Sequence, residues 1–257
     1  MSETKVLTYV GILIAVNTAF WDSVKESLWL VILLNITTVL FCALLTYIEI
    51  KITHSNRKWI DKIVYFFTKN DLDYVVEKKT VNYEIISKNN ATYSLLADIK
   101  VTSEKDNFHY NGKYVWDQKE EILVSVNDPK EYRYVHSDAL KWSNVDIYPT
   151  KPIAAKGDKY SVGFSLNNLV IGKLSKHSFL SCKVMEKIKF LHLEAKVDPN
   201  LLPSKTATLE IQNHLGIPIA KDESVPYDEA TKSYKKTLKY PRKGRKYIIH
   251  WNYDKND

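Results

Sequence analysis

The sequence predicts a transmembrane α-helical hairpin at the N-terminus, followed by a mainly antiparallel all-β domain that is either a sandwich or a barrel. Two apolar runs, residues 6–20 and 28–50, open the chain and are separated by seven residues. After residue 70, apolar and polar residues alternate with the period of two that half-buried strands show. We therefore expect a hairpin over 1–51, a basic amphipathic connector over 52–70, and a cytoplasmic β-rich domain over 71–257.

The second apolar run predicts a membrane-spanning helix, because it contains no Lys or Arg and is longer than the roughly 20 residues that a bilayer requires. The first run is shorter and spans only if Thr8, Asn17 and Trp21 lie in the interfacial zones. A cleaved signal peptide or a buried core helix are the alternatives. The nearly neutral start, Met-Ser-Glu-Thr-Lys, and the lack of an Ala-x-Ala site disfavour the signal peptide.

The distribution of basic residues predicts that both termini face the cytoplasm. The segment after the second run is basic, whereas the loop between the runs is not. Basic segments stay on the cytoplasmic side. The residues that decide this are Lys51, Arg57, Lys58, Lys62 and Lys69 against Asp61 in the segment, and Lys25 against Asp22 and Glu26 in the loop.

Each apolar run carries one distinctive face. Small residues at a spacing of four allow helices to approach closely in lipid, and Gly11, Ala15 and Ala19 have that spacing. The second run has one polar stripe, which either packs in a helix bundle or lines a pore built from several copies. The stripe consists of Asn35, Thr38, Cys42 and Glu49.

The connector predicts a basic amphipathic helix. Trp59, Ile63, Phe66 and Phe67 share one helical face, with basic residues alongside. Such a helix lies in the lipid headgroups or docks the β domain.

About ten strands are expected in the β domain, among them 81–85, 99–101, 122–126, 160–166, 191–197 and 208–211. Asn111-Gly112 lies between aromatic alternations and predicts a hairpin turn. Residues 240–251 predict a last hairpin with Tyr247, Ile249 and Trp251 on one face. The region forms one domain, or two that divide near residues 149–152.

The net charge of +7 points to an anionic partner. Residues 231–257 hold nine Lys and Arg against two Asp, interleaved with aromatic residues. Cations neutralise phosphates and aromatic rings stack on bases, whereas a solvated hairpin beside an anionic lipid surface explains the same pattern. The candidate ligand-binding residues here are Arg242, Lys243, Arg245 and Lys246.

Enzyme motifs are absent from the sequence: there is no glycine-rich phosphate loop, no His-Glu-x-x-His and no Gly-x-Ser-x-Gly. We therefore expect no catalytic residue, no metal and no cofactor. Arg133, His136 and Trp142 lie in a polar, aromatic segment that predicts part of a binding pocket. We expect no disulfide between Cys42 and Cys182, because they fall in different predicted regions.

This layout of hairpin, basic connector and β domain resembles the membrane effectors of bacterial anti-phage nucleotide-signalling systems. These are the two-helix β-barrel effectors of cyclic-oligonucleotide (CBASS) and Panoptes-type systems and the Hailong membrane effector. The resemblance covers the whole chain in layout. It implies a multi-pass protein of the bacterial inner membrane, a homo-oligomer in contact with inner-membrane lipid, and a nucleotidyltransferase encoded nearby.

The function that we expect from this resemblance is an oligomeric pore controlled by a cyclic nucleotide or a short oligonucleotide. The alternative is a membrane-anchored β-sandwich interaction module that recruits a cytoplasmic partner and conducts nothing.

Overall fold

The chain divides into two compact units, residues 1–60 and 61–257, and each is described by itself. The computed structural model describes residues 18, 29, 32–33, 35–40, 57–70, 72–87, 90–115, 122–138, 142–151, 153–169, 177–201 and 203–253. All of the strands belong to the second unit.

The predicted transmembrane hairpin and its inner-membrane location are wrong on the evidence of the described helices. Within the ranges given above, no helix combines the length and the apolar character that crossing a bilayer requires. Most of both apolar runs, including Gly11, Ala15, Ala19, Cys42 and Glu49, lies outside the described residues. Of the predicted polar stripe, Asn35 is exposed and Thr38 is buried.

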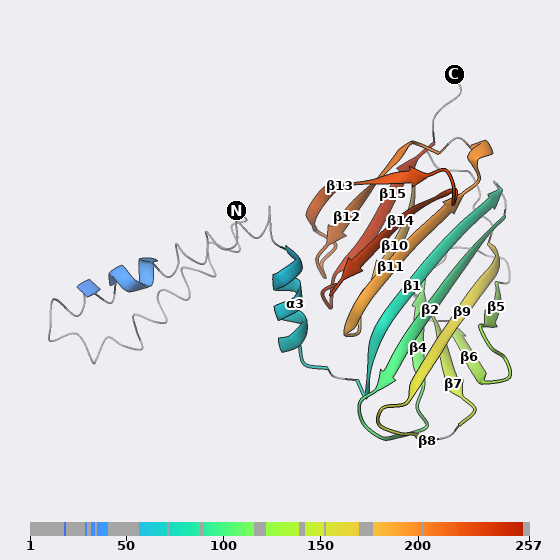
Figure 1. The fold of residues 1–257 in the computed structure, drawn as a ribbon, viewed down its shortest axis with the longest axis horizontal. Coiled ribbons are helices and arrows are strands. Elements are labelled where there is room, and N and C mark those ends of the chain that lie inside the picture. The colour runs from blue at the N-terminus through green and yellow to red at the C-terminus, as the bar shows by residue number, and fades with distance from the viewer. Residues whose placement is uncertain are drawn as a thin grey trace. The chain divides into compact units, whose positions relative to one another are not determined.

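The elements whose bounds the structure describes are helix α3, fifteen strands and one short 3₁₀ helix, and residues 18, 29, 32–33 and 35–40 are helical as well (Figure 1). In order they are α3 (Arg57–Phe67), β1 (Tyr74–Ser87), β2 (Asn90–Val101), β3 (Lys105–Asp106), β4 (Tyr110–Tyr114), β5 (Leu123–Val126), β6 (Tyr132–Asp138), β7 (Ser143–Pro149), β8 (Ile153–Ala154), β9 (Lys159–Leu169), β10 (His177–Lys183), β11 (Ile188–Val197), η1 (Pro199–Leu201), β12 (Thr206–Gln212), β13 (Pro218–Asp228), β14 (Ser233–Lys239) and β15 (Lys246–Asn252).

The mainly β fold that the sequence predicts is confirmed. Ten strands form one sheet in the order β10-β15-β12-β13-β14-β11-β1-β2-β9-β5. All of its neighbouring strands are antiparallel except β1 and β11, which run parallel. The alternation that predicts strands corresponds to real burial: along β11, Leu191, Leu193, Ala195 and Val197 are all buried.

A three-stranded sheet, β4-β7-β6, packs its apolar side against β9 of the large sheet (Figure 1). The predicted turn at Asn111-Gly112 is wrong, because both residues lie within β4 and pair with β7. Gly112 is required for packing: a Cβ atom built there would lie only 2.4 Å from Cε1 of Phe164. The glycine therefore makes room for a buried ring of β9.

The C-terminal strands of the large sheet curl back toward its centre. The ring of Trp251 on β15 lies 6.4 Å from that of Tyr83 on β1 and 5.9 Å from that of Tyr234 on β14. Tyr247, Ile249 and Trp251 alternate along β15, as expected for residues on one face, and all three are buried. The predicted last hairpin is wrong, however, because β14 pairs with β11 and β13, whereas β15 pairs with β10 and β12.

Candidate anion-binding groove

The end of helix α3 docks on the β unit through its polar face. From Asp61 on, this helix belongs to the same compact unit as the strands. Asp61 Oδ1 accepts a hydrogen bond from Arg242 Nε at 2.5 Å, and the ring of Tyr65 lies 4.9 Å from that of Tyr240. Lys187 Nζ donates to the carbonyl oxygen of Thr68 at 3.1 Å. These contacts leave the predicted apolar face exposed, with Phe66 63% and Phe67 87% accessible.

A groove of about 760 Å³ lies between this helix and the part of the large sheet where β1 begins and β2 ends. Its volume is within the range of small-molecule sites. Three rings line the groove, from Tyr65, Phe66 and Tyr240. Its charged lining comes from four separate segments of the chain: Lys100 at the end of β2, Lys156 before β9, Lys189 on β11, and Glu77 on β1.

The groove is electropositive, with a formal charge of +2 from three lysines and one glutamate. Neither Lys100 nor Lys156 makes an ion pair with any other described residue. Burial, and after it the nearby Tyr240 and Glu77, raise the pKa of Tyr65, so its phenol stays neutral near pH 7. The lining therefore offers neutral rings next to uncompensated cations.

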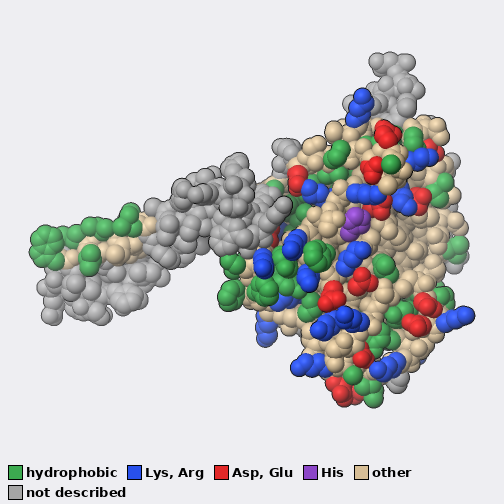
Figure 2. Space-filling model, viewed as in Figure 1, with side chains coloured by type: hydrophobic (Ala, Val, Ile, Leu, Met, Phe, Trp, Pro, Cys, Tyr) green, Lys and Arg blue, Asp and Glu red, His purple; other side chains and the backbone are tan. Residues whose placement is uncertain are grey.

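Lysine side chains next to the groove lie over aromatic rings. Lys189 Nζ is 5.6 Å from the ring centre of Phe190, and Lys239 Nζ is 5.8 Å from the same ring and 5.4 Å from that of Tyr240. The rings of Phe190 and Tyr240 stack with their centres 6.5 Å apart. Cations at such distances gain electrostatic attraction from the ring faces. Figure 2 shows green and blue side chains gathered together around α3.

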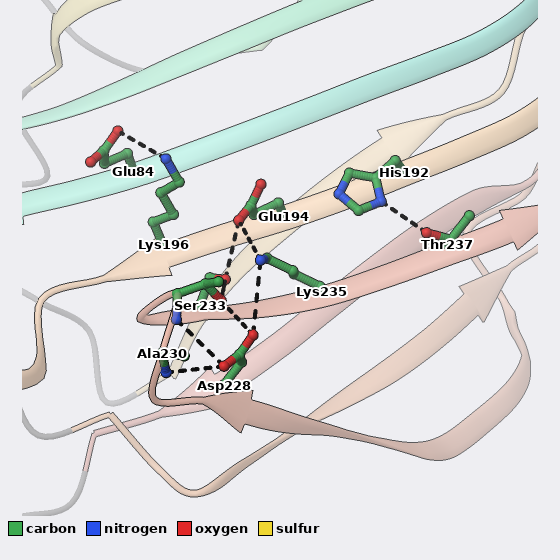
Figure 3. Close-up of polar contacts among 10 residues, drawn as sticks. Glu84, His192, Glu194, Lys196, Asp228, Ala230, Ser233, Lys235 and Thr237 are labelled. Atoms are coloured by element: carbon green, nitrogen blue, oxygen red, sulfur yellow. Dashed lines mark hydrogen bonds and ion pairs between the residues drawn. The ribbon is translucent and has the colours of Figure 1, made fainter.

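A cluster of charged and polar side chains farther along this sheet face is internally paired (Figure 3). Lys235 Nζ lies 3.5 Å from Glu194 Oε1 and 3.9 Å from Asp228 Oδ2. Ser233 donates to Glu194, and His192 Nδ1 is 2.9 Å from the hydroxyl of Thr237. Because these groups satisfy one another, the network links strands β11 and β14 and offers little to an outside ligand.

The predicted C-terminal cluster is divided by the turn between β14 and β15. Arg242 and Lys243 line a small crevice beside α3. Lys246 turns toward strand β10, where its Nζ lies 5.9 Å from the ring centre of Phe179. Arg245 accepts a backbone hydrogen bond from Val184 through its carbonyl oxygen. Of this set, Arg242 and Lys243 line the crevice beside the groove.

The second predicted set, Arg133, His136 and Trp142, is not brought together. On β6, residues 133 and 136 point to opposite faces of the three-stranded sheet because side chains alternate. Arg133 lies 5.4 Å from the ring centre of Tyr148, and Trp142 lies 5.4 Å from Lys113 Nζ. His136 instead has its Nε2 2.8 Å from the hydroxyl of Tyr114 and 3.3 Å from Asp138.

The groove residues Lys100, Lys156 and Lys189 were missed because no local motif joins them. Lys100 and Lys189 lie near strand ends and Lys156 lies in the loop before β9, and the fold of the sheet brings them together. One usable signal was Tyr65, which is the aromatic residue of α3 that lies off its predicted apolar face.

Comparisons with known proteins give no close relative. No protein-family model and no curated protein matches the chain. A candidate protease from Parabacteroides distasonis is similar at 10% identity and a TM-score of 0.37, over 70% of this chain and 40% of that one. The M1 zinc metallopeptidase of Deinococcus radiodurans is similar at 8% identity and a TM-score of 0.35, over 72% of this chain and 43% of that one. The RrgB pilus protein of Streptococcus pneumoniae is similar at 9% identity and a TM-score of 0.28, over 72% of this chain and 37% of that one.

The chain spans less than half the length of each of these three structures. With TM-scores this low, the likenesses indicate neither a shared fold nor a shared activity.

Proposed function

We propose that residues 61–257 form a binding module for a phosphorylated organic anion of the nucleotide or short oligonucleotide class. The observation that carries this proposal is the groove beside α3, where three aromatic rings meet three lysines and one acid. A base stacks on rings while cations neutralise phosphates. The predicted role as an anti-phage pore stays a prediction, and no step of this proposal depends on it.

Two neighbouring phenylalanines provide a matched test of the stacking contact. Phe66 lines the groove and Phe67 does not, although both are exposed on the same helix. With 5′-phosphorylated diadenylate as the probe, Phe66→Ala should weaken binding by roughly 5- to 100-fold, since stacking contributes about 1–3 kcal/mol per base. Phe67→Ala should change it less than twofold. Equal losses in the two variants, measured by titration calorimetry on the full chain, would contradict a stacking site in the groove.

Charge is tested separately through the unpaired lysines. The double variant Lys100→Gln, Lys156→Gln should weaken binding of the same probe at least tenfold and reduce the salt dependence of the affinity, because fewer phosphates are neutralised. Lys130→Gln, an exposed lysine in the loop before β6, is the control. Affinity that is independent of salt would refute phosphate recognition.

A second candidate function is binding of a protein partner through the apolar face of α3. The observation that favours it is the exposure of Ile63, Phe66 and Phe67 on one helix. Contiguous exposed apolar residues mark interaction sites. A protein partner that covers this face would bind Phe67→Ala more weakly, whereas nucleotide affinity should hardly change in that variant. The same pair of variants therefore separates the two functions.

A further inference from the structure

The groove continues past its aromatic wall into a second cluster of cations. A small crevice on the far side of Tyr65 and Tyr240 shares both of these residues with the groove. Three cations line that crevice against a single acid, Asp61, so its formal charge is also +2. The three cations are Lys187, Arg242 and Lys243. Two positive clusters therefore flank one pair of tyrosine rings.

The two clusters differ in what they can hold. The groove has about 760 Å³, enough for a base and its sugar, whereas the crevice has only about 10 Å³. A space of that size holds about one water-sized group. A base cannot enter it, but a phosphate oxygen can lie over it. The crevice therefore adds a phosphate contact and no base contact.

Two cations of the crevice, Lys187 and Arg242, are held in place by contacts that leave hydrogen-bond donors available. Lys187 Nζ lies 4.7 Å from the ring centre of Tyr65 and donates to the carbonyl of Thr68. A guanidinium has five N–H donors. Arg242 uses its Nε for Asp61, and its other guanidinium donors make no hydrogen bond with any other described residue. Lys243 is exposed at the rim.

We propose that the groove and crevice form one track for a linear oligonucleotide, with phosphates on both sides of the Tyr65–Tyr240 pair. This inference rests on the proposed function and specifies its ligand. Proteins that bind single strands place cations along the backbone and aromatic rings under the bases. A mononucleotide in the groove offers a single phosphate group, whereas a longer strand offers separate phosphates to the two clusters.

The length dependence of binding tests the track. We would titrate the full chain with 5′-phosphorylated oligoadenylates of one to four nucleotides. Affinity should rise at least tenfold between one and three nucleotides and then level off. The slope of log K against log salt should steepen by about 0.7 for each added phosphate contact. Equal affinity for all four lengths would overturn the track while leaving the groove as a nucleotide site.

Variants locate the second cluster. Lys243→Gln should weaken binding of the three-nucleotide probe by about 3- to 10-fold and leave the one-nucleotide probe unchanged. Lys246→Gln, three residues along but turned toward Phe179, is the matched control and should affect neither probe. Lys187→Gln provides a second test in the crevice. If Lys243→Gln and Lys187→Gln change no probe, or weaken the shortest and longest probes equally, the crevice is not part of the site.

Two further outcomes separate this inference from the proposed function. If cyclic diadenylate binds more tightly than its linear counterpart, a compact ligand is preferred and the linear track is wrong. If none of the probes binds, the proposed function fails together with the track.

Discussion

Replacing Lys79 with methionine should be among the most damaging single changes in the β unit. Lys79 Nζ lies 2.6 Å from Glu186 Oε1, and the two side chains are only 7% and 9% exposed. The hydroxyl of Tyr110 donates to the same oxygen at 3.3 Å, and the backbone N–H of Met185 donates to Glu186 Oε2. Lys79→Met removes the cation and leaves the carboxylate buried, which typically costs about 3–5 kcal/mol.

That loss corresponds to a clear thermal shift. For a domain of this size, 1 kcal/mol changes Tm by roughly 2–4 °C, so Lys79→Met should lower Tm by about 6–20 °C. Differential scanning calorimetry on the full chain gives the shift, and urea unfolding followed by circular dichroism gives the free energy of unfolding.

The double variant Lys79→Met, Glu186→Leu decides whether the ion pair is the cause. Replacing both charges by apolar groups is often neutral or stabilising, although the Tyr110 hydroxyl then loses a partner at a cost of about 1–3 kcal/mol. The double variant should therefore be more stable than Lys79→Met alone. If it is less stable than either single variant, the cost comes from packing and the reasoning is refuted.

The stability that Lys79 contributes should depend on pH. Burial lowers the pKa of Lys79, but the fields of Tyr110 and Glu186 outweigh it and the pKa is raised well above its usual value. The stability that Lys79 contributes is therefore complete below its unfolded pKa of about 10.4 and declines as pH rises toward the folded value. The gap between the natural chain and Lys79→Met should narrow above that pH.

Three other predictions concern the core. A Cβ at Gly112 would meet the side-chain ring of Phe164, whereas one at Gly163 would meet a backbone carbonyl oxygen of β2. Gly112→Ala should therefore lower the free energy of unfolding in urea by about 1–3 kcal/mol, and Gly163→Ala should lower it more. The reverse order would contradict this account. Burial raises the pKa of Cys182 to about 11. At pH 8, iodoacetamide should therefore label this thiol only after the chain unfolds, as measured by peptide mass spectrometry. Fast labelling of the native chain would disprove its burial. Burial also raises the pKa of Tyr83, so the stability it contributes is present below about pH 10 and is lost above. The difference in tyrosinate absorbance at 295 nm between the natural chain and Tyr83→Phe should therefore rise only together with loss of circular dichroism.

Local alternation was enough to predict parts of six of the fifteen described strands (β1, β2, β5, β9, β11 and β12), because it reflects burial on one face of a sheet. The pattern over 191–197 predicts β11 and its four inward residues. The same pattern says nothing about which strands pair. The parallel pairing of β1 with β11 joins segments about a hundred residues apart, and neither segment carries a local signal for its partner.

The wrong hairpin at Asn111-Gly112 shows how a tertiary contact overrides a turn signal. Asn-Gly favours a tight turn when the glycine is needed for a positive φ angle. Here Gly112 is needed because the ring of Phe164 occupies the space of its side chain. A glycine in a strand interior often marks such close approach. The buried Tyr110 and Tyr114 on either side continue the strand alternation through the glycine.

The candidate site was harder to predict because residues adjacent in sequence separate in space. The turn after Tyr240 leads from one pair of strands to another, so Arg242 reaches α3 while Lys246 reaches β10. Arg133 and His136 are three residues apart, and side chains at that spacing in a strand point to opposite faces, so this separation could be predicted from the sequence.

Charge pairing, more than charge itself, distinguishes the groove from the remainder of the sheet face. Lys235 lies between two carboxylates, whose distances of 3.5 and 3.9 Å show where its charge is balanced. A phosphate placed there would have to compete with both acids. At Lys100 and Lys156 no acid of the described chain lies within ion-pair distance, and Glu77 alone opposes the three lysines of the groove, so a phosphate would gain attraction without displacing an ion-pair partner. An anion should therefore bind beside α3 in preference to the paired network of Figure 3.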